Sequence, residues 1–321
     1  MTEASATLPP LRIGYAYESP EVLLAQPDVL AVIGFGTGTR ETRDPRHIQI
    51  GLEVLGKPVV EVWRAGGPVR HGRDGLVRCS SDGDYGFFAV ELDESGHDGI
   101  ASAAEEAYRV LTQSMHASAT PHVLRLWNYF DAINLGAGDE ERYRRFCVGR
   151  ARGMADSWRD SYPAATAIGR SDGVRALQVY ALASRSAGAP VENPRQVNAW
   201  LYPRQYGPSP PTFARGMATV AGQLLISGTA AVVGSASRHQ DDVAAQLDET
   251  LKNIDSLIGT AHAGARIGAG GLFKVYVRDR DDAALVAKRL GDVACASERV
   301  LILRGDICRR ELLVEIDGIH A

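Results

Sequence analysis

The sequence predicts an α+β protein made of two related mixed-sheet halves, with helices packed on the sheets. Two observations support this prediction. Amphipathic helical segments alternate with apolar strand segments along the chain. The order strand, strand, helix, strand also occurs twice, as FFAVELDE–helix–VLRLWNYF and later as LLISGTAAVV–helix–LFKVYVRD. Strands that return around long helices favour helices layered on sheets. We therefore take residues 1–185 as an N-terminal α+β domain and residues 186–321 as a C-terminal domain.

The first half contains strand and helix signals in alternation. Alternating segments predict strands at residues 57–66 and 85–94, and a strand that runs into a turn at residues 122–134. Residues 29–38 are an apolar run that ends in glycines. Apolar stripes at helical spacing predict helices at residues 99–117 and 139–158.

The second half opens with a proline- and glycine-rich stretch, residues 186–211, which should be extended and irregular. Long irregular segments inside a compact chain are often functional. Residues 241–259 form the clearest helix, with Gly259 as its expected stop. Further strands are predicted at residues 218–234, 272–279, 299–307 and 312–318.

The composition is that of a globular protein. The chain has 321 residues, 45% apolar and 23% charged, with a net charge of −4, so neither nucleic acid nor a membrane surface is an expected partner. No apolar segment opens the chain, and no run approaches the ~18 apolar residues of a membrane helix. Its four cysteines form no CxxC pair and are expected to be reduced, as in a cytoplasmic protein: Cys79, Cys147, Cys295 and Cys308.

The motifs of cofactor and metal sites are absent. GFGTGTR (34–40) reads GxGxGxR rather than GxGxxG and is interpreted as a glycine-rich turn. The eight histidines form neither HxH nor HExxH, and no GxSxG nucleophile motif occurs. We expect no metal and no cofactor.

Glu315 interrupts an apolar strand, LLVEIDG (312–318). Alternate side chains of a strand share a face, so Leu313, Glu315 and Asp317 should lie on one side. Either that face is solvated, or Glu315 is held at a site. The first reading is favoured for the residue alone, because carboxylates are seldom buried without a partner. If Glu315 is buried, desolvation should raise its pKa and suit it to general acid catalysis.

Other polar residues also have two readings. Cys147, in RRFCVGRA, is more often a small buried hydrophobe than a nucleophile, and Arg150 on the same helix is either solvated or turned into a cleft. Tyr202, Tyr206 and Arg215 either pack on prolines or line the mouth of a pocket.

Three donors alternate along LFKVYVRD, namely Lys274, Tyr276 and Arg278. They form either the solvated face of an edge strand or a row of donors facing an anion.

Longer motifs carry a family resemblance. About the last 125 residues resemble the YjgF-like reactive-intermediate deaminase fold, through PTFARGMATVAGQLLISGTAAVVG, KVYVRD and LLVEID. From about residue 127 onward, WNYFDAIN, YRRFCVGRA, PAATAIG, ENPRQVNAWLYPRQYGPSPPTFAR, ISGTA and DICRRELLVEIDG resemble the chorismatase family. Val300 stands about where the simpler deaminases carry their catalytic arginine, so their reaction is a weaker guide.

Chorismatases hydrolyse or rearrange chorismate and release pyruvate. The resemblance implies a C-terminal catalytic domain in which Glu315 protonates the methylene carbon of the enolpyruvyl ether. Chorismate carries two carboxylates, for which Arg and Tyr are suitable donors. The motif positions that become candidates for substrate contact are Asn128, Arg150, Tyr202, Tyr206, Arg215, Lys274 and Arg309.

Two positions resemble the branch of the family that makes 3-hydroxybenzoate. They are Gly228, in ISGTA, and Cys308, seven residues before the acid; the enzymes that hydrolyse chorismate have Ala at both. On a straight strand, Cys308 and Glu315 would face opposite ways, so the chain is expected to bend or bulge between them.

The expected site is a pocket between the two halves, floored by the C-terminal sheet and covered by residues 186–211. Hydrolysis of chorismate to a dihydroxycyclohexadiene carboxylate, or a mixture of 3- and 4-hydroxybenzoate, is the nearest alternative. A non-catalytic metabolite binder and an imine deaminase are alternatives from other classes. A monomer is expected, with a trimer as the alternative.

Overall fold

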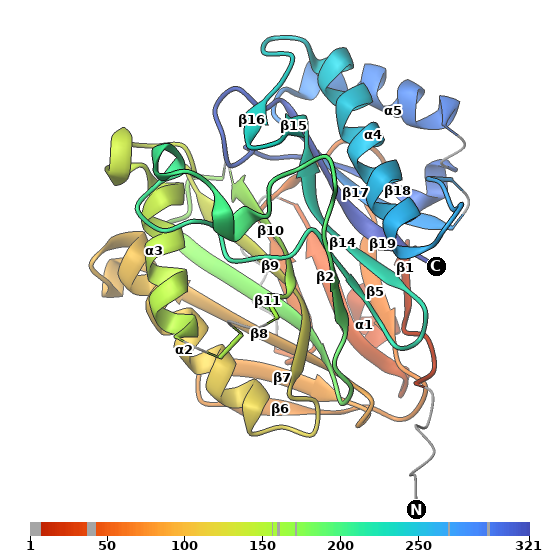
Figure 1. Ribbon diagram of the computed structural model, residues 1–321. Helices are drawn as coiled ribbons and strands as arrows, with labels where there is room; N and C mark the ends of the chain where they lie inside the picture. The colour runs from red at the N-terminus through yellow and green to blue at the C-terminus, as the bar shows by residue number, and fades with distance from the viewer. Residues whose placement is uncertain are drawn as a thin grey trace, which may run out of the picture.

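The computed structural model describes residues 8–36, 43–155, 157–158, 161–170, 172–268, 270–293 and 296–321 (Figure 1). Most of the turn predicted at 34–40 and Cys295 lie outside the described residues. The described residues form three mixed sheets of four, six and seven strands, with one further two-stranded hairpin.

The six-stranded sheet belongs to the N-terminal half and has the strand order β6-β7-β8-β11-β9-β10. Its strands are β6 (Arg70–Asp74), β7 (Val77–Ser81), β8 (Tyr85–Asp93), β9 (His122–Asp131), β10 (Ala164–Arg170) and β11 (Ala176–Ser184). Helix α2 (Gly99–His116) connects β8 to β9, and α3 (Arg142–Met154) connects β9 to β10.

The seven-stranded sheet has the order β12-β13-β14-β19-β17-β18-β4. Its strands are β12 (Ala189–Val191), β13 (Gly216–Ala218), β14 (Leu224–Ala230), β17 (Gly271–Val277), β18 (Val300–Arg304), β19 (Val314–His320) and β4 (Glu53–Val54). Helix α4 (Val243–Ala261) lies between β14 and β17 in the chain, and α5 (Ala283–Asp292) lies between β17 and β18.

The predicted duplication is confirmed. In each half, three antiparallel strands are followed by a helix, a fourth strand, a second helix and a fifth strand. The fifth strand lies parallel to the fourth, as β10 does to β9 and β18 does to β17. The last strand of each half, β11 or β19, then inserts antiparallel between the third and fourth strands. The β4 strand is the one addition, because it comes from the N-terminal half and pairs with β18.

A four-stranded sheet, in the order β1-β5-β2-β3, is built from the first part of the chain. Its elements are β1 (Arg12–Ala16), α1 (Pro20–Leu24), β2 (Val29–Phe35), β3 (His47–Ile50) and β5 (Val60–Arg64). The hairpin consists of β15 (Val232–Val233) and β16 (Ala236–Ser237).

The two large sheets face each other, and the helices cover their outer faces (Figure 1). The apolar stripe of α2 and α3 packs on the six-stranded sheet, and that of α4 and α5 packs on the seven-stranded sheet. Between the sheets lies an aromatic core that contains Trp63, Trp127, Tyr180 and Tyr276. The central strands of the duplicated halves are therefore covered on both faces, and for this reason β11 is buried along its whole length.

Both ends of α3 and of α4 differ from the prediction: α3 ends at Met154 rather than at residue 158, and α4 begins at Val243 rather than at residue 241. Helix α3 begins at Arg142 rather than at residue 139, because Gly138–Glu140 form a separate 3₁₀ turn. Helix α4 continues two residues past Gly259 and ends at Ala261, followed by His262 in extended conformation. Among the described residues, no helix is long and apolar enough to cross a membrane.

Candidate active site

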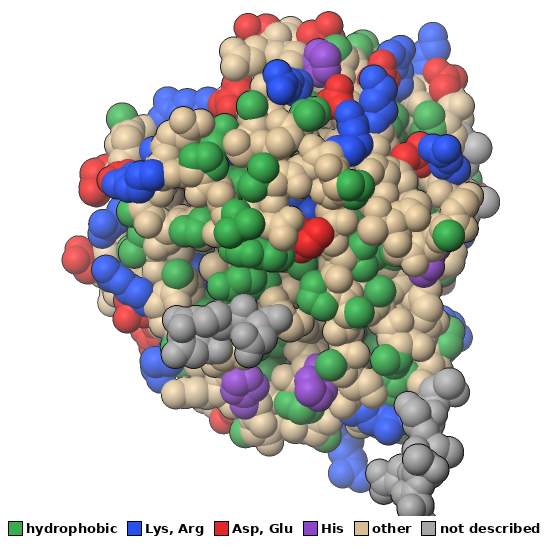
Figure 2. Space-filling view, viewed as in Figure 1, with side chains coloured by type: hydrophobic (Ala, Val, Ile, Leu, Met, Phe, Trp, Pro, Cys, Tyr) green, Lys and Arg blue, Asp and Glu red, His purple; other side chains and the backbone are tan. Residues whose placement is uncertain are grey.

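A cavity of about 450 Å³ is lined by both halves of the chain. We call residues 186–211 the cover segment; it contributes Gln196, Tyr202, Gln205, Tyr206 and Pro211. Other lining residues come from the start of α3, from β14, from the turn before β19 and from β19 itself. The cover segment holds two short 3₁₀ helices, Ala199–Leu201 and Arg204–Tyr206, and hydrophobic side chains gather over this part of the surface in Figure 2. The predicted place of the pocket is thus where the cavity lies.

Glu315 reaches this cavity from β19 and is only 4% exposed. The solvated reading of its strand face is wrong, because that face packs against the N-terminal half, and Asp317 on the same face is fully buried. Burial raises the pKa of Glu315 to about 8, and the negative charge of Asp317 adds to this effect. The positive charges of Arg215 and Arg125 lower the pKa but do not offset burial. No other described residue forms a hydrogen bond or ion pair with the Glu315 carboxyl group, so its proton is free to go to a ligand.

Gly228 lies in a β-bulge beside this carboxyl group. In the pairing of β14 with β19, two residues, Ser227 and Gly228, lie opposite the single residue Asp317. A Cβ atom on residue 228 would come within 3.0 Å of Glu315 Cδ and would collide with Oε1. Glycine is therefore required for the observed position of the acid.

Side chains and backbone from the N-terminal half hold the bulge in place. Thr166 Oγ1 accepts a hydrogen bond from the Gly228 N–H at 3.0 Å. Ser227 Oγ accepts one from the Ala165 N–H at 2.9 Å and also donates to the Ala214 carbonyl of its own half at 2.6 Å. The position of Gly228 thus depends on contacts between the two halves.

Cys308 lies in a turn at residues 308–311 and lines the same cavity as Glu315. The predicted bend between these two residues is confirmed. Arg278 stabilises the turn, because its guanidinium group donates to the carbonyls of Ile307 at 3.2 Å, Arg309 at 3.0 Å and Leu312 at 3.0 Å. Burial raises the pKa of the Cys308 thiol to about 12, so this residue is a neutral wall of the cavity.

Two arginines and two tyrosines form a second wall. Arg309 lies over the ring of Tyr206 at 4.0 Å and over that of Tyr202 at 5.2 Å. Arg215 donates a hydrogen bond from Nη2 to the Tyr202 hydroxyl at 2.7 Å, and its buried Nε has no hydrogen-bond partner among the described residues. These four predicted residues all line the cavity, where guanidinium and phenol donors suit a carboxylate.

Asn128 and Arg150, predicted to contact substrate, lie behind the cavity wall instead. Asn128 accepts a hydrogen bond from the Tyr108 hydroxyl at 2.6 Å and donates to the Thr166 carbonyl at 2.9 Å. Arg150 donates to the Thr212 carbonyl at 2.9 Å and lies 5.1 Å from the centre of the Tyr108 ring. Both therefore support residues next to the cavity, and we do not propose them as substrate contacts.

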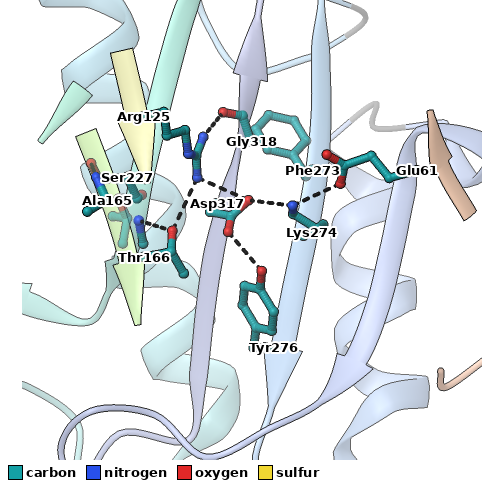
Figure 3. Close-up of polar contacts among 12 residues, drawn as sticks. Glu61, Arg125, Ala165, Thr166, Ser227, Phe273, Lys274, Tyr276, Asp317 and Gly318 are labelled. Carbon is teal, nitrogen blue, oxygen red and sulfur yellow. Dashed lines mark hydrogen bonds and ion pairs between the residues drawn. The ribbon is translucent and has the colours of Figure 1, made fainter. Parts of the chain in front are cut away.

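Lys274 also lies outside the cavity lining. The reading of its strand as a solvated edge is wrong, since β17 lies between β19 and β18. The donor row does face anions, but they are carboxylates of the protein itself. Lys274 pairs with Glu61 at 2.8 Å, and the Tyr276 hydroxyl donates to Asp317 at 2.8 Å (Figure 3).

Sequence reasoning missed Glu61, Arg125 and Thr166. Glu61 and Arg125 show the same feature that drew attention to Glu315. Each is a single charged residue inside an apolar strand, in VVEVW and VLRLW respectively. Thr166 carries no such signal, since threonine is common in strands.

Comparison with known proteins gives a consistent result. The family model described as "Chorismatase FkbO/Hyg5-like, N-terminal" matches residues 61–183. A 3-hydroxybenzoate synthase of Streptomyces hygroscopicus is 36% identical over 282 residues, which cover 82% of this chain and 82% of that protein. A chorismatase of Streptomyces rapamycinicus is 35% identical over 277 residues, covering 81% and 82%.

Solved structures agree. A crystal structure of a chorismatase matches with a TM-score of 0.86 and 32% identity, covering 98% of this chain and 99% of that one. The YjgF gene product of E. coli matches 41% of this chain over 97% of its own length, with a TM-score of 0.31 and 18% identity.

Proposed function

Because the chain belongs to the chorismatase family, we propose that it converts chorismate to 3-hydroxybenzoate and pyruvate, with Glu315 as the general acid. The observation that carries this proposal is a buried carboxyl group in the cavity wall that has no partner among the described residues. Its pKa of about 8 keeps it mostly protonated at neutral pH, as an acid must be.

In the proposed reaction, Glu315 donates its proton to the methylene carbon of the enolpyruvyl ether. The resulting oxocarbenium ion makes the ether oxygen a good leaving group. The neighbouring ring hydroxyl then forms the new C–O bond as the old one breaks, which releases pyruvate and leaves an arene oxide. The proton lost from this hydroxyl balances the one that Glu315 gave, and opening of the arene oxide yields the aromatic product. No water is consumed.

The substrate carboxylates are proposed to bind at the second wall. Arg215 and Arg309 offer guanidinium groups, and Tyr202 and Tyr206 offer hydroxyls, all on the lining of one cavity. Holding the ring at both carboxylates would present the methylene carbon to Glu315, which is the positioning that such a reaction needs.

The branch of the reaction is proposed from Gly228 and Cys308. Gly228 lets the Glu315 carboxyl group lie against the bulge, and Cys308 closes the cavity on the same side with a neutral thiol. Water attack instead of internal displacement would give the dihydroxycyclohexadiene carboxylate, and the same cavity would then hold a water molecule next to the ring.

The proposal is tested by incubating the purified protein with chorismate, without metal or nucleotide, and separating the products by chromatography with mass detection. Pyruvate with 3-hydroxybenzoate supports it. Pyruvate with the diene diol acid would retain Glu315 as the acid and refute the assignment of Gly228 and Cys308. A thermal shift without pyruvate would indicate a binder, and turnover of 2-iminobutyrate alone would indicate a deaminase.

The role of Glu315 is tested with Glu315→Gln. This variant should bind chorismate, measured by calorimetry, and should release no pyruvate above the spontaneous rate. Near-normal turnover would refute the mechanism.

We also propose a monomer, because one chain supplies both sides of the cavity. Light scattering that gave three times the chain mass would favour the trimer.

A cytoplasmic location stays a prediction from cysteine usage, supported by three described cysteines that are free thiols. Cell fractionation tests it.

A further inference from the structure

Four charged side chains are buried together between the sheets, one of them two residues from Glu315 on β19 (Figure 3). They come from three sheets: Glu61 from β5, Arg125 from β9, Lys274 from β17 and Asp317 from β19. Each is no more than 3% exposed. Burying charge is costly unless the charges are paired, so an arrangement of this size needs an explanation.

The four charges form two ion pairs, and a longer contact between Lys274 and Asp317 links one pair to the other. Arg125 lies 3.1 Å from Asp317, and Lys274 lies 2.8 Å from Glu61 and 3.9 Å from Asp317. The Tyr276 hydroxyl donates to the other Asp317 oxygen at 2.8 Å. The two cations and two anions of the cluster carry no net charge together.

Asp317 is the next side chain after Glu315 on the same face of β19. Two residues along a strand are about 6.6 Å apart, so the negative charge of Asp317 repels a negative charge on Glu315. Arg125 would otherwise attract such a charge, but it is already paired with Asp317. Lys274 is likewise held by Glu61.

Other groups face Glu315 from the remaining elements. Arg215 approaches from the residue before β13 and favours the charged carboxylate. Tyr143 of α3 and Cys308 of the turn are neutral, because burial raises the pKa of each. Tyr276 lies opposite Glu315 on β17 and is also neutral.

Asp317 is therefore the anion on this face of the sheet that favours the protonated acid. We propose that Asp317 is a positioning residue that keeps the proton on Glu315, and that Glu61 contributes by neutralising Lys274. This inference rests on the proposed role of Glu315 as the acid. It also gives the four-stranded sheet a function, since that sheet supplies Glu61.

The first test is the pH dependence of kcat in Asp317→Asn. The substitution removes the repelling charge and leaves Arg125 without its anion, and both changes favour ionised Glu315. The alkaline limb of the profile should move to lower pH by about one to two units, as expected for charges about 6.6 Å apart at an effective dielectric constant of about 20. Turnover at pH 6 should fall by about twofold at most, while turnover at pH 8 falls by about 5- to 50-fold. An unmoved midpoint overturns the inference.

A second comparison does not depend on the folding of Asp317→Asn. Glu61→Gln leaves Lys274 as an unbalanced cation and should move the same limb to lower pH by a smaller amount. The double variant Glu61→Gln/Lys274→Met removes the pair together and restores neutrality, so its limb should return to the wild-type position. Equal profiles for the single and double variants would show that charge balance has no effect on Glu315.

A readout other than activity separates this inference from the proposed function. Difference infrared spectroscopy, with Glu315→Gln as reference, follows the protonated carboxyl band of Glu315 as pH is raised. The band should disappear at lower pH in Asp317→Asn than in the wild type. If Glu315→Gln turns over chorismate normally, the proposed function fails. If Glu315→Gln is inactive and the band midpoint is unmoved in Asp317→Asn, the proposed function stands and the inference fails.

Discussion

Replacing Glu315, the proposed catalytic acid, should make the protein more stable above pH 5. The pKa of Glu315 is raised from 4.5 to about 8 in the folded chain. In the unfolded chain this carboxyl group ionises above pH 4.5, whereas in the folded chain it stays protonated until about pH 8. Stability is therefore full below pH 4.5 and is lost as the pH rises through 8. The loss is about 3 kcal/mol at pH 7 and close to about 5 kcal/mol above pH 9.

Glu315→Gln removes this loss because the amide does not ionise. Its free energy of unfolding should exceed that of the wild type by about 2–3 kcal/mol at pH 7, which is about 3–5 °C in Tm for a chain of this size. The difference should vanish near pH 4 and grow towards pH 9. Thermal denaturation followed by circular dichroism at pH 4, 7 and 9 measures it.

The control is Glu105→Gln. Glu105 lies on α2, is about half exposed and pairs loosely with Arg152 at 3.7 Å. Its difference from the wild type should stay within about 0.5 kcal/mol at each pH. If Glu315→Gln followed the same flat dependence as this control, the argument that burial holds the proton on Glu315 would be refuted.

Three further predictions concern activity and the buried cluster. The kcat of the wild type should be constant below pH 7 and fall as the pH rises through about 8, because only the protonated form of Glu315 can serve as the proposed acid. A rate that increases through pH 8, measured by pyruvate release, would contradict this. Gly228→Ala should push the Glu315 carboxyl group out of its place, lower kcat by about 10- to 100-fold and shift the product towards the diene diol acid. Chromatography of the products measures this, and an unchanged product at an unchanged rate would show that the position of the carboxyl group is unimportant. Lys274→Met should lower the free energy of unfolding in urea by about 3–5 kcal/mol, because Glu61 stays buried without its cation. The double variant Glu61→Gln/Lys274→Met should recover most of this loss. An unchanged free energy of unfolding in Lys274→Met would contradict the pairing.

The duplicated fold could be predicted because each half repeats the same order of strand and helix patterns. The order of strands within each sheet could not. Strands β11 and β19 insert between strands that precede them in the chain, and nothing in their local sequence specifies this long-range pairing. The four-stranded sheet was only partly predicted, since the short β1 and β3 carry weak strand signals.

The site shows a different limit. Glu315, Arg215 and Arg309 were found through motifs and line the cavity, whereas Asn128 and Lys274 were found in the same way and lie behind it. A polar residue in an apolar strand signals a buried polar network. The sequence does not say on which side of the wall the residue lies, because that depends on how the two sheets pack against each other.

Both edge strands of the seven-stranded sheet are short, and this lowers the tendency of the protein to aggregate at high concentration. One edge is β12, three residues long with Pro190 at its centre, and the other is β4, two residues long. Glu53 of β4 is paired with Arg280 at 2.6 Å and with Arg304 at 3.8 Å. Short strands, proline and fixed charges make a poor template for a strand from another molecule. By lending β4 to the sheet of the other half, the N-terminal part of the chain shields β18 from edge-to-edge aggregation.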